Sequence, residues 1–433
     1  MKILVVGGGG REHALAWKIA RSPMVSKVFV APGNAGTARE PGLVNVDIGA
    51  EDIPALFRFA EDERIDLTVV GPEAPLVAGI VDTFRDGGLN IFGPTRDAAQ
   101  LEGSKAFTKD FLRRHNIPTA RYGVFTEVAE ALDFIHDHGA PIVVKADGLA
   151  AGKGVILAQT IEEANAAVRD MLAGNAFGEA GHRVVIEEFL TGEEASFICM
   201  VDGRNVLPMA TSQDHKARDE GDRGPNTGGM GAYSPAPVIT PEIEQRILRE
   251  VIEPTVIGMA TEGMPYTGFL YAGLMIGEDG TPRVLEYNCR FGDPETQPIM
   301  LRLRSDLVQL IEAALAGRLD ETKAEWDPRA ALGVVLAAEG YPGSYRKGDV
   351  ITGLDADDDG RTCKIFHAGT CERDGQIVTC GGRVLCATAL GDTVTEAQQR
   401  AYQLADQIRW DGAYLRRDIG WRAVEREQQG TRN

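Results

Sequence analysis

The glycine-rich segment KADGLAAGKG, residues 145–154, constrains the fold most, because an apolar run lies on each side of it. PIVVKAD leads into it and GVILAQ leads out of it, and both runs are typical of strands. A Walker A loop instead joins a strand to a helix and has four residues between its Gly and its Gly-Lys, followed by Ser or Thr. Here three residues separate Gly148 from Gly152, and Gly154 follows Lys153. We therefore expect a hairpin whose loop closes over phosphates as a lid.

Size, charge and cysteine pattern narrow the class of protein. The 433 residues are too many for one ordinary core, so roughly two to four domains are expected. A net charge of −19 argues against nucleic-acid binding, although a local cluster of Lys, Arg and N–H groups can still hold a small anion. The chain has no apolar run of about eighteen residues and no C-x-x-C pair among its six cysteines. We expect a cytoplasmic protein with reduced thiols and no membrane partner.

The pattern of apolar runs predicts an α/β and α+β multidomain protein. Residues 1–103 alternate short apolar runs with helical patterns, which is typical of a parallel α/β domain. Residues 104–325 form the expected central domain, with a small antiparallel unit at about 122–193 that carries the lid. Residues 326–433 are expected to form a small strand-rich closing domain with an amphipathic helix around 394–409.

The first turn, VVGGGGREHA, resembles a dinucleotide-binding turn only in part. Gly7 and Gly9 fit the G-x-G-x-x-G fingerprint, but Glu12 stands where its third glycine belongs. The second predicted strand, KVFVAPGN, also ends without the acidic residue that would bind ribose. NAD is therefore disfavoured. An anion at this helix start stays open, since the turn exposes N–H groups and Arg11 adds charge; a tight turn without a ligand is the alternative.

Three further positions carry binding hypotheses. Glu73 follows a buried strand, where α/β sheets bind ligands, and could accept hydrogen bonds from a sugar or be a solvated loop residue. Lys145 ends the strand before the glycine loop and could neutralise α- and β-phosphates or face solvent at an edge. In VVIEEFLTGEEASF, the backbone of EEFL could pair with an adenine edge, and Glu193 or Glu194 with ribose hydroxyls, although ordinary hairpin acids have the same pattern.

The segment VLEYNCRFGDPETQ gives the strongest signal. Alternate residues of a strand share a face, which puts Glu286, Asn288 and Arg290 together. Two oxygen ligands beside an arginine suit magnesium bridging phosphates, with the arginine on a phosphate or carboxylate. Asp293 and Glu295 are expected to project from the following turn. The segment SQDHKARDEGDRGPNTGGMGAYSP is expected to be a long polar loop that closes over a substrate.

With these residues in view, the chain resembles the ATP-grasp ligases, and among them the phosphoribosylamine–glycine ligase family of purine biosynthesis. RFGDPETQ is the most specific match, and GGGGREHA, KADGLAAGKGV, SQDHK, GPNTGGMGAYSP and TGFLYAGLM follow the family's order over essentially the whole chain. The resemblance implies an N-terminal pre-ATP-grasp α/β domain, a two-lobed ATP-grasp core that holds the nucleotide and a C-terminal domain that completes the site. It also implies a monomer with the small-molecule substrates ATP, glycine and 5-phosphoribosylamine.

The resemblance also assigns residues. ATP would be bound by Lys105, Lys145, Gly152, Lys153, Gly154, Glu187, Glu188, Phe189, Leu190, Glu193 and Glu194. The phosphoribosyl substrate would be bound by Gly10, Arg11, Glu73, Asp214 and Asp293, and the expected catalytic residues are Arg290, Asp293 and Lys216. Glu286 and Asn288 would bind Mg²⁺ or Mn²⁺. Many ATP-grasp enzymes carry a second acidic ligand on the preceding strand, but YAGLMIG has none, so the number of metal ions stays open.

The implied reaction needs no protein nucleophile. The carboxylate of glycine would attack the γ-phosphate of ATP to form glycyl phosphate, and the amine of phosphoribosylamine would then expel phosphate, leaving glycinamide ribonucleotide and ADP. The nearest alternative is another ATP-grasp ligase of purine ribonucleotides that uses carboxyphosphate or formyl phosphate. A nucleotide sensor without catalysis is disfavoured. The EYNCR segment, together with Lys105 and Lys145, is suited to phosphoryl transfer, which a sensor does not need.

Overall fold

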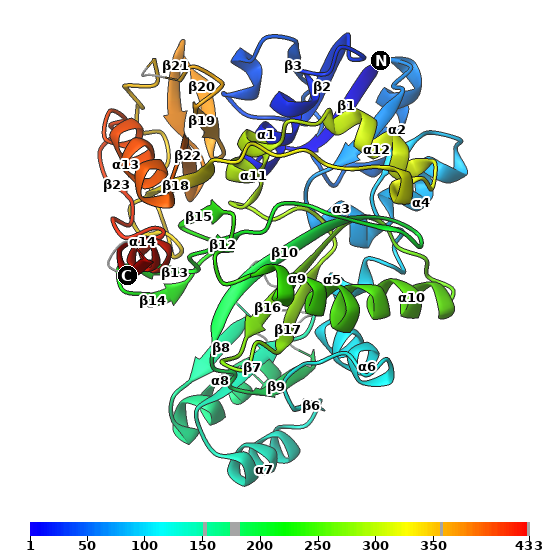
Figure 1. Ribbon diagram of the computed structural model, residues 1–433, viewed down its shortest axis with the longest axis vertical. Helices are drawn as coiled ribbons and strands as arrows, with labels where there is room; N and C mark the ends of the chain where they lie inside the picture. The colour runs from blue at the N-terminus through cyan, green and yellow to red at the C-terminus, as the bar shows by residue number, and fades with distance from the viewer. Residues whose placement is uncertain (150–153, 174–181, 356–357, 431–433) are drawn as a thin grey trace.

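The computed structural model describes residues 1–149, 154–173, 182–355 and 358–430 (Figure 1). The N-terminal part is a five-stranded sheet in the order β3-β2-β1-β4-β5, and every pairing is parallel, as the alternating pattern predicted. Its strands are β1 (Lys2–Gly7), β2 (Lys27–Pro32), β3 (Leu43–Asn45), β4 (Leu67–Val70) and β5 (Ile91–Phe92). Its helices are α1 (Gly10–Ile19), η1 (Thr37–Arg39), α2 (Ile53–Asp62), α3 (Glu73–Ala78), α4 (Ile80–Asp86) and α5 (Gln100–Gly103).

A small antiparallel sheet lies at the opposite end of the molecule in Figure 1. Its order is β6-β9-β7-β8, from β6 (Tyr122–Phe125), β7 (Ile142–Ala146), β8 (Val155–Ala158) and β9 (Val184–Glu188). The helices α7 (Val128–His138) and α8 (Ile161–Ala173) pack against it. Strands β7 and β8 pair antiparallel, with Lys145 opposite Val155, so the strand–loop–strand prediction is confirmed for the strands that flank the glycine segment.

The central sheet has the antiparallel order β11-β10-β16-β17. Its strands are β10 (Glu193–Asp202), β11 (Val206–Pro208), β16 (Thr267–Ile276) and β17 (Pro282–Asn288). Both faces of β10 are buried: Phe197 and Cys199 join one apolar cluster, whereas Ile198 and Met200 join another. The sheet therefore lies between two cores. The associated helices are α6 (Lys105–Arg114), α9 (Pro241–Ile247), the π-helix η3 (Leu248–Ile252) and α10 (Glu253–Thr261).

The C-terminal sheet takes in strands from the middle of the chain. Its path is β12-β15-β18-β22-β19, formed by β12 (Gln213–Asp214), β15 (Gly231–Ser234), β18 (Ala330–Ala338), β22 (Arg383–Gly391) and β19 (Cys363–His367), with β23 (Ala413–Tyr414) beside β18. The segment predicted as one long loop therefore contains strands, including the hairpin of β13 (Ala217–Asp219) and β14 (Arg223–Asn226). Within the C-terminal sheet, β15 of this segment pairs with β18, so the sheet crosses the boundary expected at residue 325.

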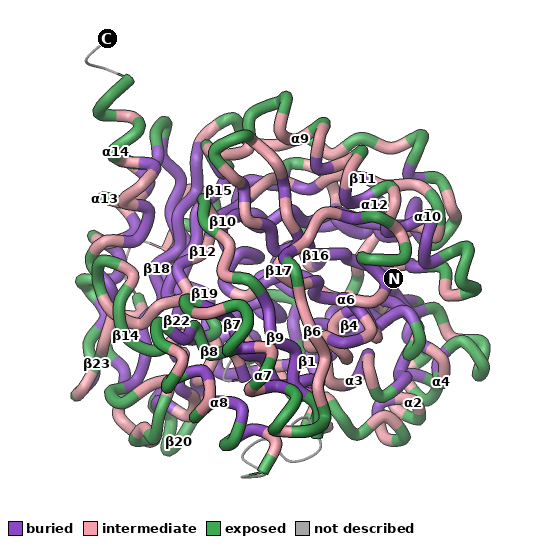
Figure 2. The backbone as a smooth tube through the Cα atoms, turned by 90° about the horizontal axis from the view of Figure 1, so that it is seen from below, coloured by how far each residue is buried: buried purple, intermediate pink, exposed green. Residues whose placement is uncertain are grey.

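The remaining elements cover these sheets. They are the hairpin of β20 (Thr370–Arg373) and β21 (Gln376–Thr379) and the helices α11 (Thr296–Arg302), α12 (Leu307–Leu315), η4 (Leu319–Glu321), α13 (Val394–Ala405) and α14 (Trp421–Gly430). Figure 2 shows buried backbone gathered along the sheets and exposed backbone at the outer loops and at the end of α14. Within the described ranges, no helix has the length and apolarity to span a membrane.

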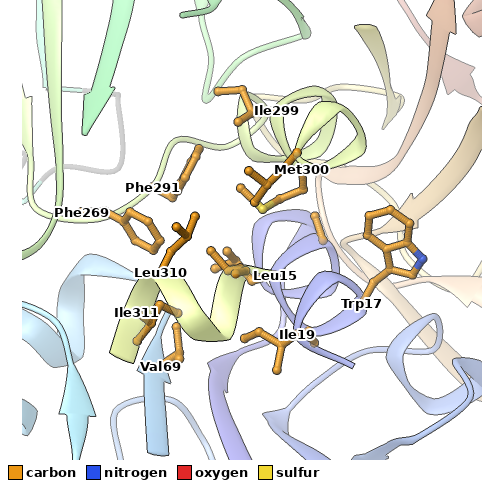
Figure 3. Close-up of a cluster of buried hydrophobic side chains, with 14 of the residues drawn as sticks. Leu15, Trp17, Ile19, Val69, Phe269, Phe291, Ile299, Met300, Leu310 and Ile311 are labelled. Atoms are coloured by element: carbon orange, nitrogen blue, oxygen red, sulfur yellow. The ribbon is translucent and has the colours of Figure 1, made fainter. Parts of the chain in front are cut away.

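One apolar cluster holds α1, the central sheet and α11–α12 together (Figure 3). Leu15 and Ile19 of α1 pack with Met300 of α11 and Ile311 of α12. Phe291 follows β17 directly and packs edge-to-face against Phe269, with ring centroids 4.8 Å apart. This packing fixes the first turn of α1 next to the segment that follows β17, and both of these segments carry predicted site residues.

Candidate active site

The end of β17 presents polar side chains on one side and buried ones on the other. Tyr287 and Cys289 are buried in an apolar cluster, as the alternation predicted. The Glu286 carboxylate lies 3.4 Å from Nζ of Lys216. Burial alone would raise the pKa of Glu286, but Lys216, Lys145 and Lys105 together hold it at about 2. Three lysines from different elements thus converge on one carboxylate.

The lysines are held by the small sheet and by α6. Ser104 caps α6, since its Oγ accepts a hydrogen bond from the N–H of Phe107, and Lys105 follows at the first helical position. Nζ of Lys105 donates to the carbonyl of Gly148, on the glycine segment, over 2.8 Å. Burial lowers the pKa of Lys105, and Glu286 partly offsets this effect. The α6 helix therefore aims a poorly solvated cation at the end of β17.

Glu187 is a buried carboxylate between two lysines. Its side chain is 2% exposed and lies 2.9 Å from Nζ of Lys145 and 2.9 Å from Nζ of Lys109. Burial raises the pKa of Glu187, but Lys145 and Lys109 outweigh that effect and lower it. The carboxylate is thus committed to the two lysines. Sequence reasoning missed Lys109, although it stands four residues after Lys105 and therefore on the same face of α6.

The segment between β9 and β10 joins the small sheet to the central one. Glu188 is exposed and pairs with Arg121 over 3.3 Å, while Phe189 and Leu190 are half-buried. The next two carboxylates have different partners. Glu194 pairs with Lys216, and Glu193 pairs with Arg426 of the C-terminal helix α14. The four predicted acids therefore do not act as one cluster.

Asp214 and Lys216 lie beside this group. Burial raises the pKa of Asp214 well above its usual value, against the opposing charge of Lys216, and the nearby Glu295 raises it further. The pKa of Lys216 is also well above its usual value, because Glu194 and Glu286 outweigh the effect of burial. The end of β12 thus brings Asp214 into the field of Lys216, Glu194 and Glu286.

The first glycine turn forms a second group of polar residues. Glu12 accepts hydrogen bonds from the N–H of Gly9, at 2.7 Å, and from Nε of Arg11, at 2.5 Å. A Cβ added at Gly7 or Gly71 would lie within 2.4 Å of Glu12 atoms, so the carboxylate fills the space between these two glycines. Glu12, which stands where the dinucleotide fingerprint has its third glycine, therefore has a structural role in the turn.

Arg290 joins the end of β17 to α3 and α5, and Arg11 of the glycine turn donates to the carbonyl of the next residue, Phe291, over 3.3 Å. The Arg290 guanidinium lies 3.1 Å from Glu73 and 3.0 Å from Glu102. Burial raises the pKa of Glu73, but Arg290 and Arg11 together hold it at about 2. Burial also raises the pKa of Glu102 above its usual value. Glu73 starts α3 rather than ending β4, and Glu102 was not expected from sequence.

Asp293 completes the second group. It accepts a hydrogen bond from Gln297 over 2.9 Å and lies 3.4 Å from Nη2 of Arg383, which also donates to the carbonyls of Asp293 and Gly228. Although burial raises the pKa of Asp293, Arg383 and Arg11 lower it overall. A Cβ added at Gly10 would lie 3.7 Å from the Asp293 carboxylate. Sequence reasoning missed Arg383, which comes from β22 in the C-terminal sheet.

The donor set at Glu286 and Asn288 fits a hard divalent cation. A carboxylate and an amide oxygen are ligands that magnesium accepts. Asn288 is buried, with 9% of its surface exposed. No group of three or more His, Cys, Asp or Glu side chains in the same ranges could hold a metal. Of the glycine-loop residues, Gly152 and Lys153 lie outside the described residues, and the carbonyl of Gly154 accepts from Ala146 over 2.8 Å.

Comparison with known proteins decides between the families that fit this geometry. Three domains of phosphoribosylglycinamide synthetase match in order: the N domain at residues 1–102, the ATP-grasp (A) domain at 103–296 and the C domain at 331–422. The chain belongs to the phosphoribosylglycinamide synthetase family. The resemblance and the fold class predicted from sequence are thereby confirmed. ATP-grasp ligases use ATP and a divalent metal ion.

Individual relatives agree with this membership. The chain is 69% identical to the phosphoribosylamine–glycine ligase of Vibrio cholerae and 70% identical to that of Escherichia coli, over 99% of this chain and all of each relative. The solved phosphoribosylamine–glycine ligase of Thermotoga maritima is 36% identical, with a TM-score of 0.84 over 97% of this chain and all of that one. A biotin carboxylase from Campylobacter jejuni shares the fold alone, at 15% identity and a TM-score of 0.74 over 96% of this chain and 92% of its own.

Replacing Arg290 tests the second group of residues. We expect Arg290→Met to lower the free energy of unfolding by about 3 kcal/mol near neutral pH, because it leaves two carboxylates without their cation. The loss should shrink as the pH falls from about 4.5 toward about 2. The pKa of Glu73 is depressed in the folded state, so its stabilising contribution is present above the unfolded pKa and disappears once the group is protonated.

Chemical denaturation of wild type, Arg290→Met and Arg290→Lys from about pH 7 to about pH 3 measures this effect. The lysine variant keeps the charge and should lose less stability. A destabilisation of Arg290→Met that stays constant over the whole pH range would contradict the pairing of Arg290 with Glu73.

Proposed function

We propose that this chain joins glycine to 5-phosphoribosylamine at the expense of ATP, giving glycinamide ribonucleotide, ADP and phosphate in purine biosynthesis. The observation that carries the proposal is that Lys216 lies 3.4 Å from the Glu286 carboxylate while Lys145 donates to the neighbouring Leu285 carbonyl over 3.1 Å and Lys105 to the carbonyl of Gly148 over 2.8 Å. Several cations around a metal-binding carboxylate are what a triphosphate requires. The close relatives named phosphoribosylamine–glycine ligase support the choice of substrates.

The first group of residues is proposed as the ATP site. Lys105 and Lys145 would neutralise phosphates, and the backbone from Glu187 to Leu190 would meet the adenine at the junction of the two sheets. Glu193 or Glu194 would accept a hydrogen bond from a ribose hydroxyl. Gly152, Lys153 and Gly154 would cover the phosphates, and Glu188 would contribute its backbone. The support is the position of β9, β10 and β17 around the three lysines.

Glu286 and Asn288 are proposed as ligands of Mg²⁺ or Mn²⁺, since both offer the hard oxygen donors that these ions prefer. The ion, when bound, would offset the negative charge of the phosphates. Lys216, 3.4 Å from the Glu286 carboxylate, would stabilise the charge that develops on the transferred phosphoryl group, and Asp214 would bind substrate.

The second group of residues is proposed as the phosphoribosyl site. Gly10 and Arg11 would bind its phosphate at the start of α1, where helix N–H groups favour an anion. Glu73 and Asp293 would accept from its hydroxyls or its amine, with Arg290 between the two groups of residues. The support is that a Cβ added at Gly10 would lie 3.7 Å from the Asp293 carboxylate and that Arg290 lies 3.1 Å from Glu73, although these residues are far apart in sequence.

The remaining predictions concern the protein as a whole. We propose domains at 1–103, 104–325 and 326–433, and a cytoplasmic location, for which the six free thiols are the support. A monomeric state and the absence of a nucleic-acid partner stay predictions from the sequence.

The choice of acid is tested by measuring ADP release with phosphoribosylamine and each of three acids. We expect rapid ADP release with glycine and background release with bicarbonate or formate. Omission of phosphoribosylamine should slow turnover with glycine, because the acyl phosphate then has no acceptor. Equal or faster release with bicarbonate or formate would overturn the proposed function in favour of another ATP-grasp ligase.

Replacing the proposed metal ligand tests the ATP site. We expect Glu286→Gln to fold normally but to lose turnover on the order of a hundred-fold, since one such transition-state interaction is lost. The measurement is the initial rate over a magnesium titration, with Glu278→Gln, on the exposed turn after β16, as the matched control. If Glu286→Gln keeps wild-type turnover at limiting magnesium, the metal assignment is wrong.

A further inference from the structure

Lys216 lies on a short connection between β12 and β13, and hydrogen bonds hold its backbone. Its carbonyl accepts from the N–H of Thr227 over 2.7 Å and from the Thr227 hydroxyl over 2.8 Å. Its ammonium lies 3.4 Å from the Glu286 carboxylate and also pairs with Glu194. The position of the ammonium therefore depends on how firmly the chain is held on both sides of the lysine.

The residue before Lys216 is bound by the chain between β23 and α14. Nε2 of His215 accepts a hydrogen bond from the N–H of Gly420 over 2.8 Å. Nδ1 of the same buried ring lies 3.5 Å from the Asp222 carboxylate. Burial lowers the pKa of His215 more than Asp222 raises it, so the ring is neutral near neutral pH and can accept at Nε2.

The residue after Lys216 is bound by the same part of the chain. Nη1 of Arg416 donates to the carbonyl of Ala217 over 3.0 Å and to Asp222 over 3.0 Å. Nε and Nη2 of this fully buried side chain donate to Asp418 over 2.8 Å each. Burial lowers the pKa of Arg416, but Asp418 and Asp222 outweigh that effect and raise it. The guanidinium is therefore charged and has a fixed orientation.

Asp222 joins this part of the chain to the hairpin that follows Lys216. It lies on the turn between β13 and β14, and besides Arg416 it accepts from Nη2 of Arg422 over 2.7 Å and from Nε1 of Trp421 over 3.3 Å. Figure 1 shows α14 beside this hairpin. The contacts come from far along the chain, since 199 positions separate Arg416 from the carbonyl that it binds.

We propose that the C-terminal segment 416–420 positions Lys216 against Glu286 for phosphoryl transfer, with Arg416 as its main positioning residue. The proposal rests on the function and the role of Lys216 proposed above. Arg416 acts through the Ala217 carbonyl and Asp222 rather than by contact with substrate. A group misplaced by about 1 Å can cost on the order of a hundred-fold in rate, so an anchor on each side of the lysine matters to the chemical step.

The test measures kcat and the KM for ATP at saturating glycine and phosphoribosylamine. We expect Arg416→Met, which keeps the aliphatic stem, to lower kcat roughly ten-fold and to leave the KM within about two-fold of wild type, because Lys216 acts on charge that develops in the transition state. Arg416→Lys should recover part of kcat, since it keeps the charge but not the fork. Arg417→Met, which breaks an exposed pair with Asp406 at the next position, should behave as wild type.

A Lys216→Met background shows whether Arg416 acts through the lysine. Adding Arg416→Met to Lys216→Met should lower kcat no further. A substitution that only reduced the amount of folded enzyme would instead cost the same factor in both backgrounds. His215→Phe removes the other anchor without removing a charge, because it keeps a ring but offers no acceptor to the N–H of Gly420. It should lower kcat in the same way, and only when Lys216 is present.

If Lys216→Met keeps wild-type kcat, the role of Lys216 is wrong and the inference falls with it, while the glycine assay still tests the ligase function. If Lys216→Met lowers kcat but Arg416→Met keeps it or raises only the KM for ATP, the positioning role is overturned. A further loss of kcat in the double variant would also overturn it. Should Arg416→Met fail to fold, His215→Phe decides: wild-type kcat overturns the inference, and a loss confined to the Lys216 background supports it.

Discussion

Buried cations need carboxylates close by, and this electrostatic constraint organises the whole centre of the molecule. Lys105, Lys145 and Lys109 are poorly solvated, and an unpaired ammonium in such a place would lose its proton or destabilise the fold. Glu187 and Glu286 balance the lysines in the free protein. The same cations would meet the phosphates of ATP, and fixed charges of this kind are how electrostatic catalysis avoids reorganisation.

The second requirement is that distant segments meet. Leu15 of α1 and Phe291 after β17 belong to one apolar cluster, so packing rather than polar contact brings the glycine turn to the RFGDPETQ segment. Arg290 and Arg383 then add specific contacts on this frame. The order of causes runs from the apolar core to the polar site: the core fixes the backbone, and the charges then select the side-chain geometry.

Local pattern was enough to predict several parts of this structure. Alternation along β17 correctly separated Tyr287 and Cys289 from the polar side, and the apolar runs around the glycine segment predicted the β7–β8 hairpin. Ser104 caps α6, in line with the preference of serine for this position. These features depend on neighbours within a few residues, where side-chain period and capping chemistry determine the outcome.

Other parts depend on contacts that no local pattern encodes. The pairing of β15 with β18 changes a predicted loop into part of the C-terminal sheet, and strand register between remote segments is set by the packed core. Glu193 and Glu194 look equivalent in sequence, but Arg426 binds one and Lys216 the other. The sequence did not indicate that Asp293 would pair with Arg383 or Glu73 with Arg290, because the two members of each pair are far apart along the chain.

The central claim is that the lysines around Glu286 serve transfer of the γ-phosphoryl group of ATP to the carboxylate of glycine. The most direct measurement follows heavy oxygen from the glycine carboxylate in a complete reaction with ATP and phosphoribosylamine. The account predicts ADP as the nucleotide product and one labelled oxygen in the inorganic phosphate, because the carboxylate oxygen that attacks the γ-phosphate leaves with it. Labelled AMP, or phosphate without label, would contradict it.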